Sequence, residues 1–444
     1  MVFILVQFLL AVSSPTRFIY LSLWAQTIPY TWNWDTQLIY DTPVGPLALV
    51  AIQLFGFCLA CVLVMATHLE SCISHAKNYK WHLIFIGFCL ASLLYGPSVA
   101  YGLRMLAKLL GPLLFMIVVL AVIQSEQQLQ EMRKAILGSG LLLLILALYA
   151  RASGINSDPN AAQSGLSGLG PPSMGPPVFS AHMLPVAMLA VAAYVCSPRT
   201  AKLVVAIICS AAVIGALQRT SAAALYAGIA AILFFGSRGI WRIVLPSAGI
   251  IALPVLIVFS PTFRKRMFFG DESSDQLLDN PLKAASGING SGRFSLWDQA
   301  LSKFFAPHPA IGSGIGSTQE YLATGSSAGV VHSEYVRLLC EVGVIGLTLF
   351  AFALLSYFWR LRRYASKSNP PALRSAGLAA IGALLTYCIF CSTDNAFDYV
   401  TQFGIYVFGL VAIADKTGEI AAQVPADSSV AREAALPPFP NLLR

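Results

Sequence analysis

The chain contains apolar stretches of the length that crosses a membrane, and this pattern limits its fold more than any other feature. A membrane-spanning helix needs about 20 mostly apolar residues, and about twelve such stretches can be counted here. They lie near residues 2–29, 44–66, 81–97, 103–123, 134–150, 178–196, 200–217, 220–236, 240–260, 337–359, 373–393 and 399–414. We therefore expect an all-α, polytopic membrane protein with about 12 transmembrane helices.

The amino-acid composition supports the same class. Hydrophobic residues make up 57% of the chain and charged residues only 11%, whereas soluble domains carry about 25% charged residues. The mean hydropathy is +0.71. These values argue against a cytosolic enzyme and against a nucleic-acid-binding module. The net charge of +8 is explained by basic cytoplasmic loops, so it needs no acidic partner.

The hydropathy pattern divides the chain into four regions. Residues 1–260 are expected to hold transmembrane helices with short loops, residues 261–336 a large periplasmic loop, residues 337–414 the C-terminal transmembrane helices, and residues 415–444 a disordered cytoplasmic tail. In the first apolar stretch, Pro15 favours either one kinked helix or two short ones. We expect one kinked helix.

Lysine and arginine in the short loops indicate how the chain is oriented. Basic residues are enriched in cytoplasmic loops of membrane proteins. They occur here in alternate connections, which are therefore expected to be cytoplasmic: Lys77 and Lys80; Arg133 and Lys134; Arg199 and Lys202; Arg238 and Arg242; Arg360, Arg362, Arg363, Lys367 and Arg374. The connections between them face the opposite side, which in a bacterium is the periplasm. The large loop of residues 261–336 belongs to that side.

One part of this large loop is expected to be structured. Phe294, Trp297, Leu301 and Phe304 recur at helical spacing, with polar side chains between them. This pattern predicts an amphipathic helix over residues 294–305 that lies along the membrane surface or covers the mouth of the bundle.

Two arginines are candidates for binding an anion. Arg219 lies between two apolar stretches, with no carboxylate near it in sequence, and Arg293 follows a glycine-rich segment and opens the amphipathic helix. A planar guanidinium can hold two phosphate oxygens at once, and the start of a helix favours anions. The alternatives are an interfacial side chain for Arg219 and a solvated loop residue for Arg293.

A histidine at the end of the large loop is the candidate catalytic residue. His332 enters an apolar helix from the aqueous side, where a neutral imidazole can accept a proton. Glu334, Arg337 and Glu341 follow at spacings of three and four residues, so they can hold one another on one helix face. A purely structural histidine is the alternative.

Acidic residues occupy the outward turn between the last two apolar stretches. Asp394 or Asp398 can orient His332 or bind an acceptor, and simple helix capping is the alternative for both. The basic run of Arg264, Lys265 and Arg266 suits acidic lipid head groups or phosphorylated sugars, with a membrane-interface anchor as the alternative, and no site role is assigned to it.

No metal or cofactor is expected. The pairs Cys58 with Cys61 and Cys388 with Cys391 have the spacing of zinc ligands, but each lies within an apolar stretch and is better explained by packing. The sequence also lacks the phosphate-binding loop, His-Glu-x-x-His and Asp-x-Asp motifs.

Three sequence blocks resemble one known family. They are Gly292-Arg293 followed by Trp297, the segment PAIGSGIG at residues 309–316, and HSEYVRLLCEVGVIGL at residues 332–347. Together they resemble the O-antigen ligase and polymerase superfamily of bacterial inner-membrane glycosyltransferases, most closely the ligase. The resemblance covers about residues 200–360. Val336 departs mildly from the leucine that is common in the last block.

This resemblance implies a substrate pair and roles for individual residues. The donor is a glycan on undecaprenyl pyrophosphate, and the acceptor is the lipid A-core for a ligase, a second lipid-linked repeat unit for a polymerase, or a protein hydroxyl in related enzymes. His332 takes the place of the family's essential histidine and acts as general base. Arg219 and Arg293 match its two arginines, and Asp394 or Asp398 its acidic residue. The resemblance implies membrane lipid as a neighbour and no nucleic acid as a partner.

Two other functions are weighed against the ligase. A polymerase of the same superfamily is not separable from a ligase by these motifs. A transporter of lipid-linked sugar belongs to a different class, and it is expected to have broken spans and paired halves. The apolar stretches here are mostly plain, which favours the enzyme.

Overall fold

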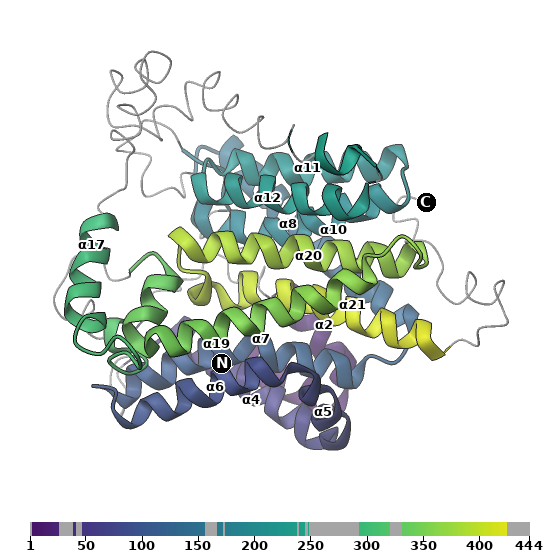
Figure 1. Cartoon of the computed structure of the whole chain (residues 1–444). Coiled ribbons are helices and arrows are strands. Elements are labelled where there is room, and N and C mark those ends of the chain that lie inside the picture. Colours follow the sequence, from purple (N-terminus) through teal and green to yellow (C-terminus); the bar gives the residue numbers. More distant parts are fainter. Residues whose placement is uncertain are drawn as a thin grey trace, which may run out of the picture.

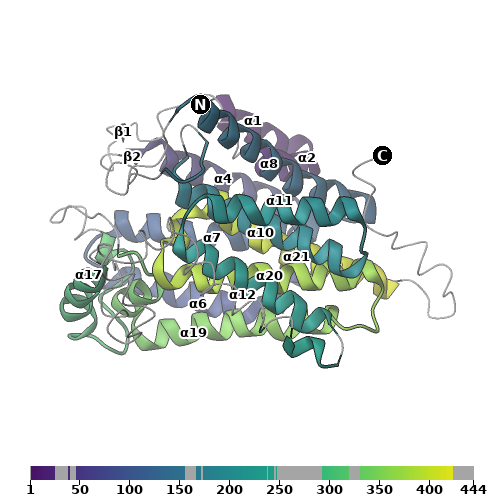
Figure 2. The same ribbon diagram turned by 90° about the horizontal axis from the view of Figure 1, so that it is seen from above.

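A computed structural model describes residues 2–25, 39–40, 47–155, 167–171, 174–237, 239–244, 247, 293–319 and 331–423. The described chain is almost entirely helical. Its exception is a pair of two-residue antiparallel strands, β1 (Ile39–Tyr40) and β2 (Leu47–Ala48), in which Ile39 lies opposite Ala48. Long helices packed side by side form the body of the protein (Figures 1 and 2).

Most of the long helices run along a common direction (Figure 1), and the described part of the chain has fourteen α-helices in all. They are α1 (Val2–Ser13), α2 (Pro15–Ala25), α4 (Leu49–Thr67), α5 (Leu69–Ala76), α6 (Lys80–Ala91), α7 (Val99–Val122), α8 (Glu126–Ala152), α10 (Pro176–Cys196), α11 (Thr200–Gly215), α12 (Arg219–Gly236), α17 (Arg293–Ala300), α19 (Glu334–Tyr364), α20 (Pro371–Thr393) and α21 (Ile405–Gln423). Short 3-10 turns η1 (Lys77–Tyr79), η2 (Ser92–Leu94) and η4 (Ala396–Tyr399) and π turns η3 (Leu301–Phe305) and η5 (Val400–Gly404) adjoin them. Figure 1 shows α20 in the middle of the molecule, between α10–α12 and α19.

Seven of the described helices are long and apolar enough to cross a membrane. They are α7, α8, α10, α12, α19, α20 and the helix over Ala396–Gln423, and the bent pair Gln53–Thr67 and Leu69–Leu94 makes an eighth if it is counted as one span. The predicted count of twelve is therefore not confirmed. The helix Thr200–Gly215 falls short of the required length, and the stretch at residues 240–260 lies mostly outside the described residues.

The first apolar stretch forms two consecutive helices, α1 and α2, that are separated at Ser14. Pro15 has no N–H to donate, and the backbone hydrogen bonds from Ser14 to Leu10 and from Phe18 to Ser14 continue on either side of it. The break thus falls where the sequence predicted a kink, although the chain forms two helices where we expected one.

The centre of the bundle depends on close approach of the helices. Most residues of α10 are buried, and α12 and α20 pack on it. A Cβ atom on Gly228 of α12 would lie 2.5 Å from Sδ of Met188 in α10. Small residues that let helices approach closely are typical of membrane helix packing, and they hold α12 and α20 in place beside the site described below.

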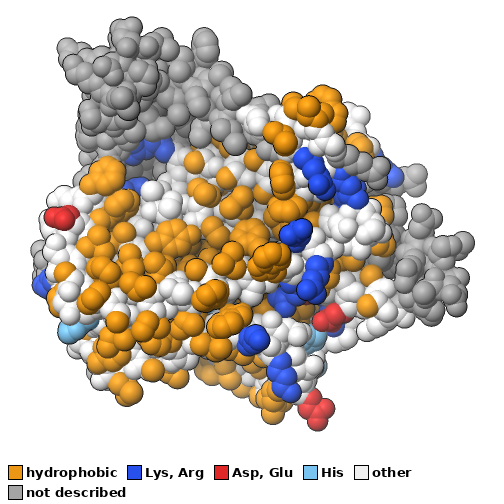
Figure 3. All heavy atoms as spheres, viewed as in Figure 1, with side chains coloured by type: hydrophobic (Ala, Val, Ile, Leu, Met, Phe, Trp, Pro, Cys, Tyr) orange, Lys and Arg blue, Asp and Glu red, His pale blue; other side chains and the backbone are white. Residues whose placement is uncertain are grey.

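The predicted cytoplasmic loops gather at one end of the bundle. The Arg360 guanidinium donates to the carbonyl of Asn78 (3.3 Å), and the Arg374 guanidinium donates to the carbonyl of Gly236 (2.5 Å). In Figure 3, hydrophobic side chains cover the middle of the visible face, and Lys and Arg side chains collect toward one end. The described loops therefore separate into two groups as the alternation of basic residues predicted, while the cytoplasmic assignment of this end stays a prediction.

The last helix runs further than the hydropathy pattern indicated. The tail was predicted to begin at residue 415, but α21 continues to Gln423. Asp415 is buried, and it is compensated there by a hydrogen bond from Tyr79 (2.6 Å) and an ion pair with Arg360 (3.0 Å). Paired charges can remain inside a helix bundle, so the first charged residue did not mark its end. Residues 424–444 lie outside the described part.

Candidate active site at one end of the helix bundle

His332 has an unusual backbone conformation directly before α19. Its φ angle is +55°, and Ser333 caps the helix by accepting a hydrogen bond from the N–H of Val336 (3.4 Å). A non-glycine residue in the left-handed region costs on the order of 1–3 kcal/mol and tends to occur at functional sites. The histidine is therefore held in its position by its surroundings.

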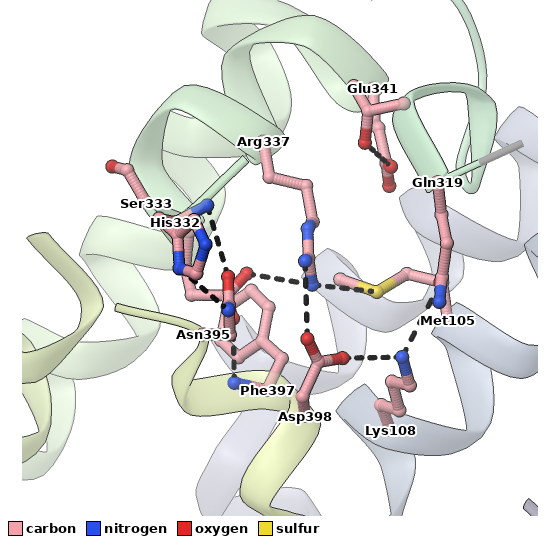
Figure 4. A network of polar contacts seen from close by, with 12 residues as sticks. Met105, Lys108, Gln319, His332, Ser333, Arg337, Glu341, Asn395, Phe397 and Asp398 are labelled. Carbon is pink, nitrogen blue, oxygen red and sulfur yellow. Dashed lines mark hydrogen bonds and ion pairs between the residues drawn. The ribbon is translucent and has the colours of Figure 1, made fainter. Parts of the chain in front are cut away.

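Asn395 holds His332 through two hydrogen bonds. The backbone N–H of His332 donates to Oδ1 of Asn395 (3.1 Å), and Nδ2 of Asn395 lies 3.1 Å from Nδ1 of the imidazole. Asn395 is 5% exposed and lies in the turn after α20 (Figure 4). Sequence analysis missed this residue. Its position between Asp394 and Asp398, in the turn already singled out, was the available signal.

Arg293 and the start of α12, which contains Arg219, lie at the same turn. The Arg293 guanidinium donates to the backbone carbonyl of Thr393 (2.5 Å). The hydroxyl of Thr393 is 2.6 Å from that of Thr220, and Thr220 is the second residue of α12, which Arg219 opens. Residues far apart in sequence, namely Arg219, Arg293 and His332, are thus placed around the turn that follows α20.

The predicted amphipathic helix is present and supports the segment before His332. It consists of α17 followed by the π turn η3. Nε1–H of Trp297 donates to the carbonyl of Val331 (2.8 Å), and Phe304 packs with Cys340 of α19. Phe294 is 65% exposed, so it does not share the buried face with Phe304 as the periodicity suggested. The reason is that α17 spans only eight residues before the π turn changes the helical register.

A buried chain of ion pairs lies beneath the histidine. Arg337 pairs with Glu334 (3.1 Å) and with Asp398 (3.4 Å), and Lys108 of α7 pairs with Asp398 (2.5 Å; Figure 4). Glu334 also accepts a hydrogen bond from the backbone N–H of Phe397 (2.8 Å). This network joins α7 and α19 to the turn after α20, and sequence analysis did not include Lys108 in it.

The network separates residues that sequence spacing grouped together. Arg337 and Glu334 pair as their spacing predicted, whereas Glu341 accepts a hydrogen bond from the hydroxyl of Thr318 (2.5 Å). Asp398 forms ion pairs with Arg337 and Lys108. Asp394 instead accepts hydrogen bonds from the backbone N–H of Asn395 (2.8 Å) and from the hydroxyl of Tyr399 (3.4 Å). Asp394 therefore shapes the turn and Asp398 anchors it to α7 and α19.

The surroundings of His332 keep its imidazole neutral. Burial, together with the positive charges of Arg293 and Arg337, lowers the pKa of His332 to about 4, while Asp398 acts in the opposite direction. At neutral pH the ring therefore has one protonated and one unprotonated nitrogen. Among the described residues, no group of three or more His, Cys, Asp or Glu side chains could hold a metal ion.

The glycine-rich segment at residues 309–316 packs into a break in α19. Gly343 has a φ angle of +67° and interrupts the helix, so nearby backbone groups lose their helical partners. The segment replaces those partners with four hydrogen bonds: Ser313 N to Cys340 O (2.8 Å), Gly314 N to Glu341 O (2.9 Å), Val344 N to Pro309 O (2.9 Å) and Ile345 N to Ala310 O (3.1 Å). This packing fixes the first part of α19, which carries the ion pairs.

We expect Gly312→Ala to destabilise the protein more than a matched glycine substitution. Gly312 has a φ angle of +70°, and an added Cβ would lie 2.4 Å from the carbonyl carbon of Glu341. Gly154 has the same φ angle, but a Cβ added there would meet no atom within 4 Å, so Gly154→Ala is the control. Backbone strain of about 1–3 kcal/mol applies to both variants, and the clash applies only to Gly312→Ala. Thermal unfolding in detergent should show a clearly larger fall in the unfolding temperature for Gly312→Ala than for Gly154→Ala. Equal falls would contradict the described packing.

The fold and the polar site define the class of this protein as a multi-pass helical membrane protein with a group of charged and polar side chains at one end of its bundle. A family model described as O-antigen ligase matches residues 204–351. This match supports the resemblance to the O-antigen ligase superfamily that the motifs indicated. It includes Arg219, Arg293 and His332 but ends before the turn that holds Asn395. A comparison with curated proteins found no match.

Proposed function

We propose that the protein is an O-antigen ligase that transfers a glycan from undecaprenyl pyrophosphate to a sugar hydroxyl of the lipid A-core. The superfamily supports a lipid-linked glycan as substrate. The observation that carries the proposal is the meeting of the start of α12, Arg293 and His332 around the turn after α20. In this proposal the protein lies in the bacterial inner membrane, and the site faces the periplasm.

The proposed reaction needs groups that neutralise the departing diphosphate. The acceptor oxygen attacks the anomeric carbon, and undecaprenyl pyrophosphate leaves as an anion. Guanidinium groups placed in advance stabilise such developing charge strongly where water is partly excluded. We assign this role to Arg293 and Arg219. The activated donor supplies the free energy, and one direct displacement inverts the anomeric configuration.

His332 is the residue that we place beside the reacting atoms. The resemblance implies that it is a general base, a role that is typically worth about 10² to 10⁴ in rate. That role requires an unprotonated nitrogen that faces the acceptor hydroxyl. Asp394 and Asn395 are assigned to shaping the turn, and Asp398, Glu334 and Arg337 to supporting it from below.

We expect His332→Ala to lower glycan transfer by about 100-fold or more, because it removes the imidazole from the reaction centre. The measurement is transfer by the purified protein in detergent, with the lipid-linked donor and the lipid A-core acceptor both supplied. His308→Ala, which changes an exposed histidine in the turn after η3, is the matched control and should retain activity. Full transfer by His332→Ala would remove this residue from the site.

Two alternatives are separated by further measurements. A polymerase of the same superfamily would use a second lipid-linked repeat unit as acceptor, so deletion of its gene should leave lipopolysaccharide with a single repeat. Loss of a ligase should instead leave uncapped core and accumulated lipid-linked polymer. A transporter would move the lipid-linked sugar without joining it to an acceptor, so product formation by the purified protein in detergent excludes transport as the explanation.

A further inference from the structure

The contact between Asn395 and His332 determines which ring nitrogen carries the proton. A backbone N–H can only donate, so the atom of Asn395 that faces the N–H of His332 (3.1 Å) must be the carbonyl oxygen Oδ1. The amide nitrogen Nδ2 then faces Nδ1 of the imidazole (3.1 Å) and donates to it. In a neutral imidazole whose Nδ1 accepts a hydrogen bond, the proton is on Nε2.

The reverse orientation of the amide is unfavourable. Rotating the Asn395 side chain by half a turn would place its NH₂ group against the backbone N–H of His332, so that two donors would face each other. The backbone of Asn395 is also fixed, because its N–H donates to Asp394 (2.8 Å) and its carbonyl accepts from Asp398 (3.0 Å). The residue is 5% exposed, so water cannot readily replace these contacts.

The charges around His332 also favour an imidazole that donates a hydrogen bond over one that accepts a proton as a base. The positive charges of Arg293 and Arg337 and the negative charge of Asp398 act on the ring. Both arginines oppose the uptake of a proton by the imidazole. An N–H group beside the Arg293 guanidinium is instead well placed to bind the same anion. Among the described residues, Nε2 of His332 has no hydrogen-bonding partner, which leaves this N–H available to a ligand.

We propose that Asn395 is a positioning residue that keeps the proton of His332 on Nε2, so that His332 donates a hydrogen bond to the diphosphate of the donor substrate. This inference rests on the proposed function and replaces the role of general base with that of hydrogen-bond donor. The bond between the anomeric carbon and the diphosphate oxygen breaks as the acceptor oxygen forms its new bond. The acceptor oxygen attacks from the face opposite the diphosphate, so its proton passes to solvent water on that face, and His332 keeps its own proton throughout.

Asn395→Asp separates the two roles because it reverses the tautomer at nearly constant shape. A carboxylate can accept hydrogen bonds from both the backbone N–H and Nδ1–H of His332, so the proton moves to Nδ1 and Nε2 becomes an acceptor. The tautomer set by such a neighbour changes catalysis by a histidine by up to about 10⁴-fold. We expect Asn395→Asp to lower transfer at least about 100-fold. Unchanged or faster transfer would mean that His332 is a base and would overturn the inference.

The tautomer itself can be measured without any activity. We expect ¹⁵N NMR of histidine-labelled protein in detergent to show, for the resonances that disappear in His332→Gln, a protonated Nε2 and an unprotonated Nδ1. A protonated Nδ1 in the unaltered protein overturns the inference whether or not Asn395→Asp folds. Asn78→Asp makes the same chemical change at an exposed turn and should leave both the tautomer and the transfer rate unchanged.

These measurements also distinguish failure of this inference from failure of the proposed function. If the purified protein transfers no glycan to any supplied acceptor, the proposed function fails while the NMR result still reports the tautomer. If transfer occurs and Nδ1 carries the proton, the function stands and only the donor role of His332 is lost.

Discussion

Arg293→Ala is expected to lower the rate of glycan transfer by about 100- to 1000-fold, which is the usual effect of removing one pre-placed donor from a site where charge develops. Arg293 is partly buried at the start of α17, and the carbonyl of Thr393 orients its guanidinium (2.5 Å). The side chain therefore needs little rearrangement to meet a diphosphate. Transfer by the purified variant, at saturating acceptor and varied donor, is the measurement.

The comparison of Arg293→Lys with Arg293→Ala tests what kind of group is needed. Lysine keeps the positive charge but loses the planar fork that grips two oxygens, so we expect Arg293→Lys to recover only part of the rate. Arg242→Ala, which alters an exposed arginine beyond α12, is the matched control and should have full activity. If Arg293→Ala folds and transfers glycan at the normal rate, the assignment of the diphosphate to this arginine is wrong.

Among the substitutions considered, Arg337→Met should cause the largest loss of stability. Arg337 is 2% exposed and is the shared partner of Glu334 and Asp398. Removing one member of a buried charge pair typically costs about 3–5 kcal/mol, because the remaining charge stays buried without compensation. We expect a marked fall in the thermal unfolding temperature in detergent and in the yield of folded protein.

A double variant tests whether the loss comes from the unpaired charge. Arg337→Met leaves the carboxylate of Glu334 buried and without its partner. Adding Glu334→Gln removes that charge, so the double variant should recover part of the stability. Arg362→Met alters an exposed arginine near the other end of α19 and should change stability by less than about 0.5 kcal/mol. Similar losses for Arg337→Met and Arg362→Met would show that the ion pairs contribute little.

The described contacts give separate tasks to residues that stand next to each other in the turn after α20. Asn395 contacts the histidine, Asp394 shapes the turn, and Asp398 ties the turn to Lys108 and Arg337. A substitution at Asp398 is thus expected to act mainly through stability, and one at Asn395 mainly through the chemistry of His332. The sequence alone offered Asp394 and Asp398 as equal alternatives.

Several features could be predicted from sequence because they depend on short stretches of chain. Apolar runs of sufficient length indicated the membrane helices, and the spacing around Trp297 indicated the helix α17. The ends of the helices were predicted less well, because hydropathy did not decide whether Pro15 kinks one helix or separates two, and it did not show that the paired Asp415 lets α21 continue. Local composition thus defines the class of fold better than the ends of its elements.

The amino-acid pattern alone predicted a helical membrane protein, indicated its resemblance to the O-antigen ligase superfamily and singled out His332, Arg219 and Arg293 as candidate site residues. The contacts of Asn395 and Lys108 became evident only from the folded chain. Asn395 is 63 residues from His332, and Lys108 is 290 residues from Asp398. No periodicity links such distant positions, because their meeting depends on how α7, α19 and α20 pack. The tautomer of His332 and the pairing of its supporting charges are therefore properties of the tertiary structure.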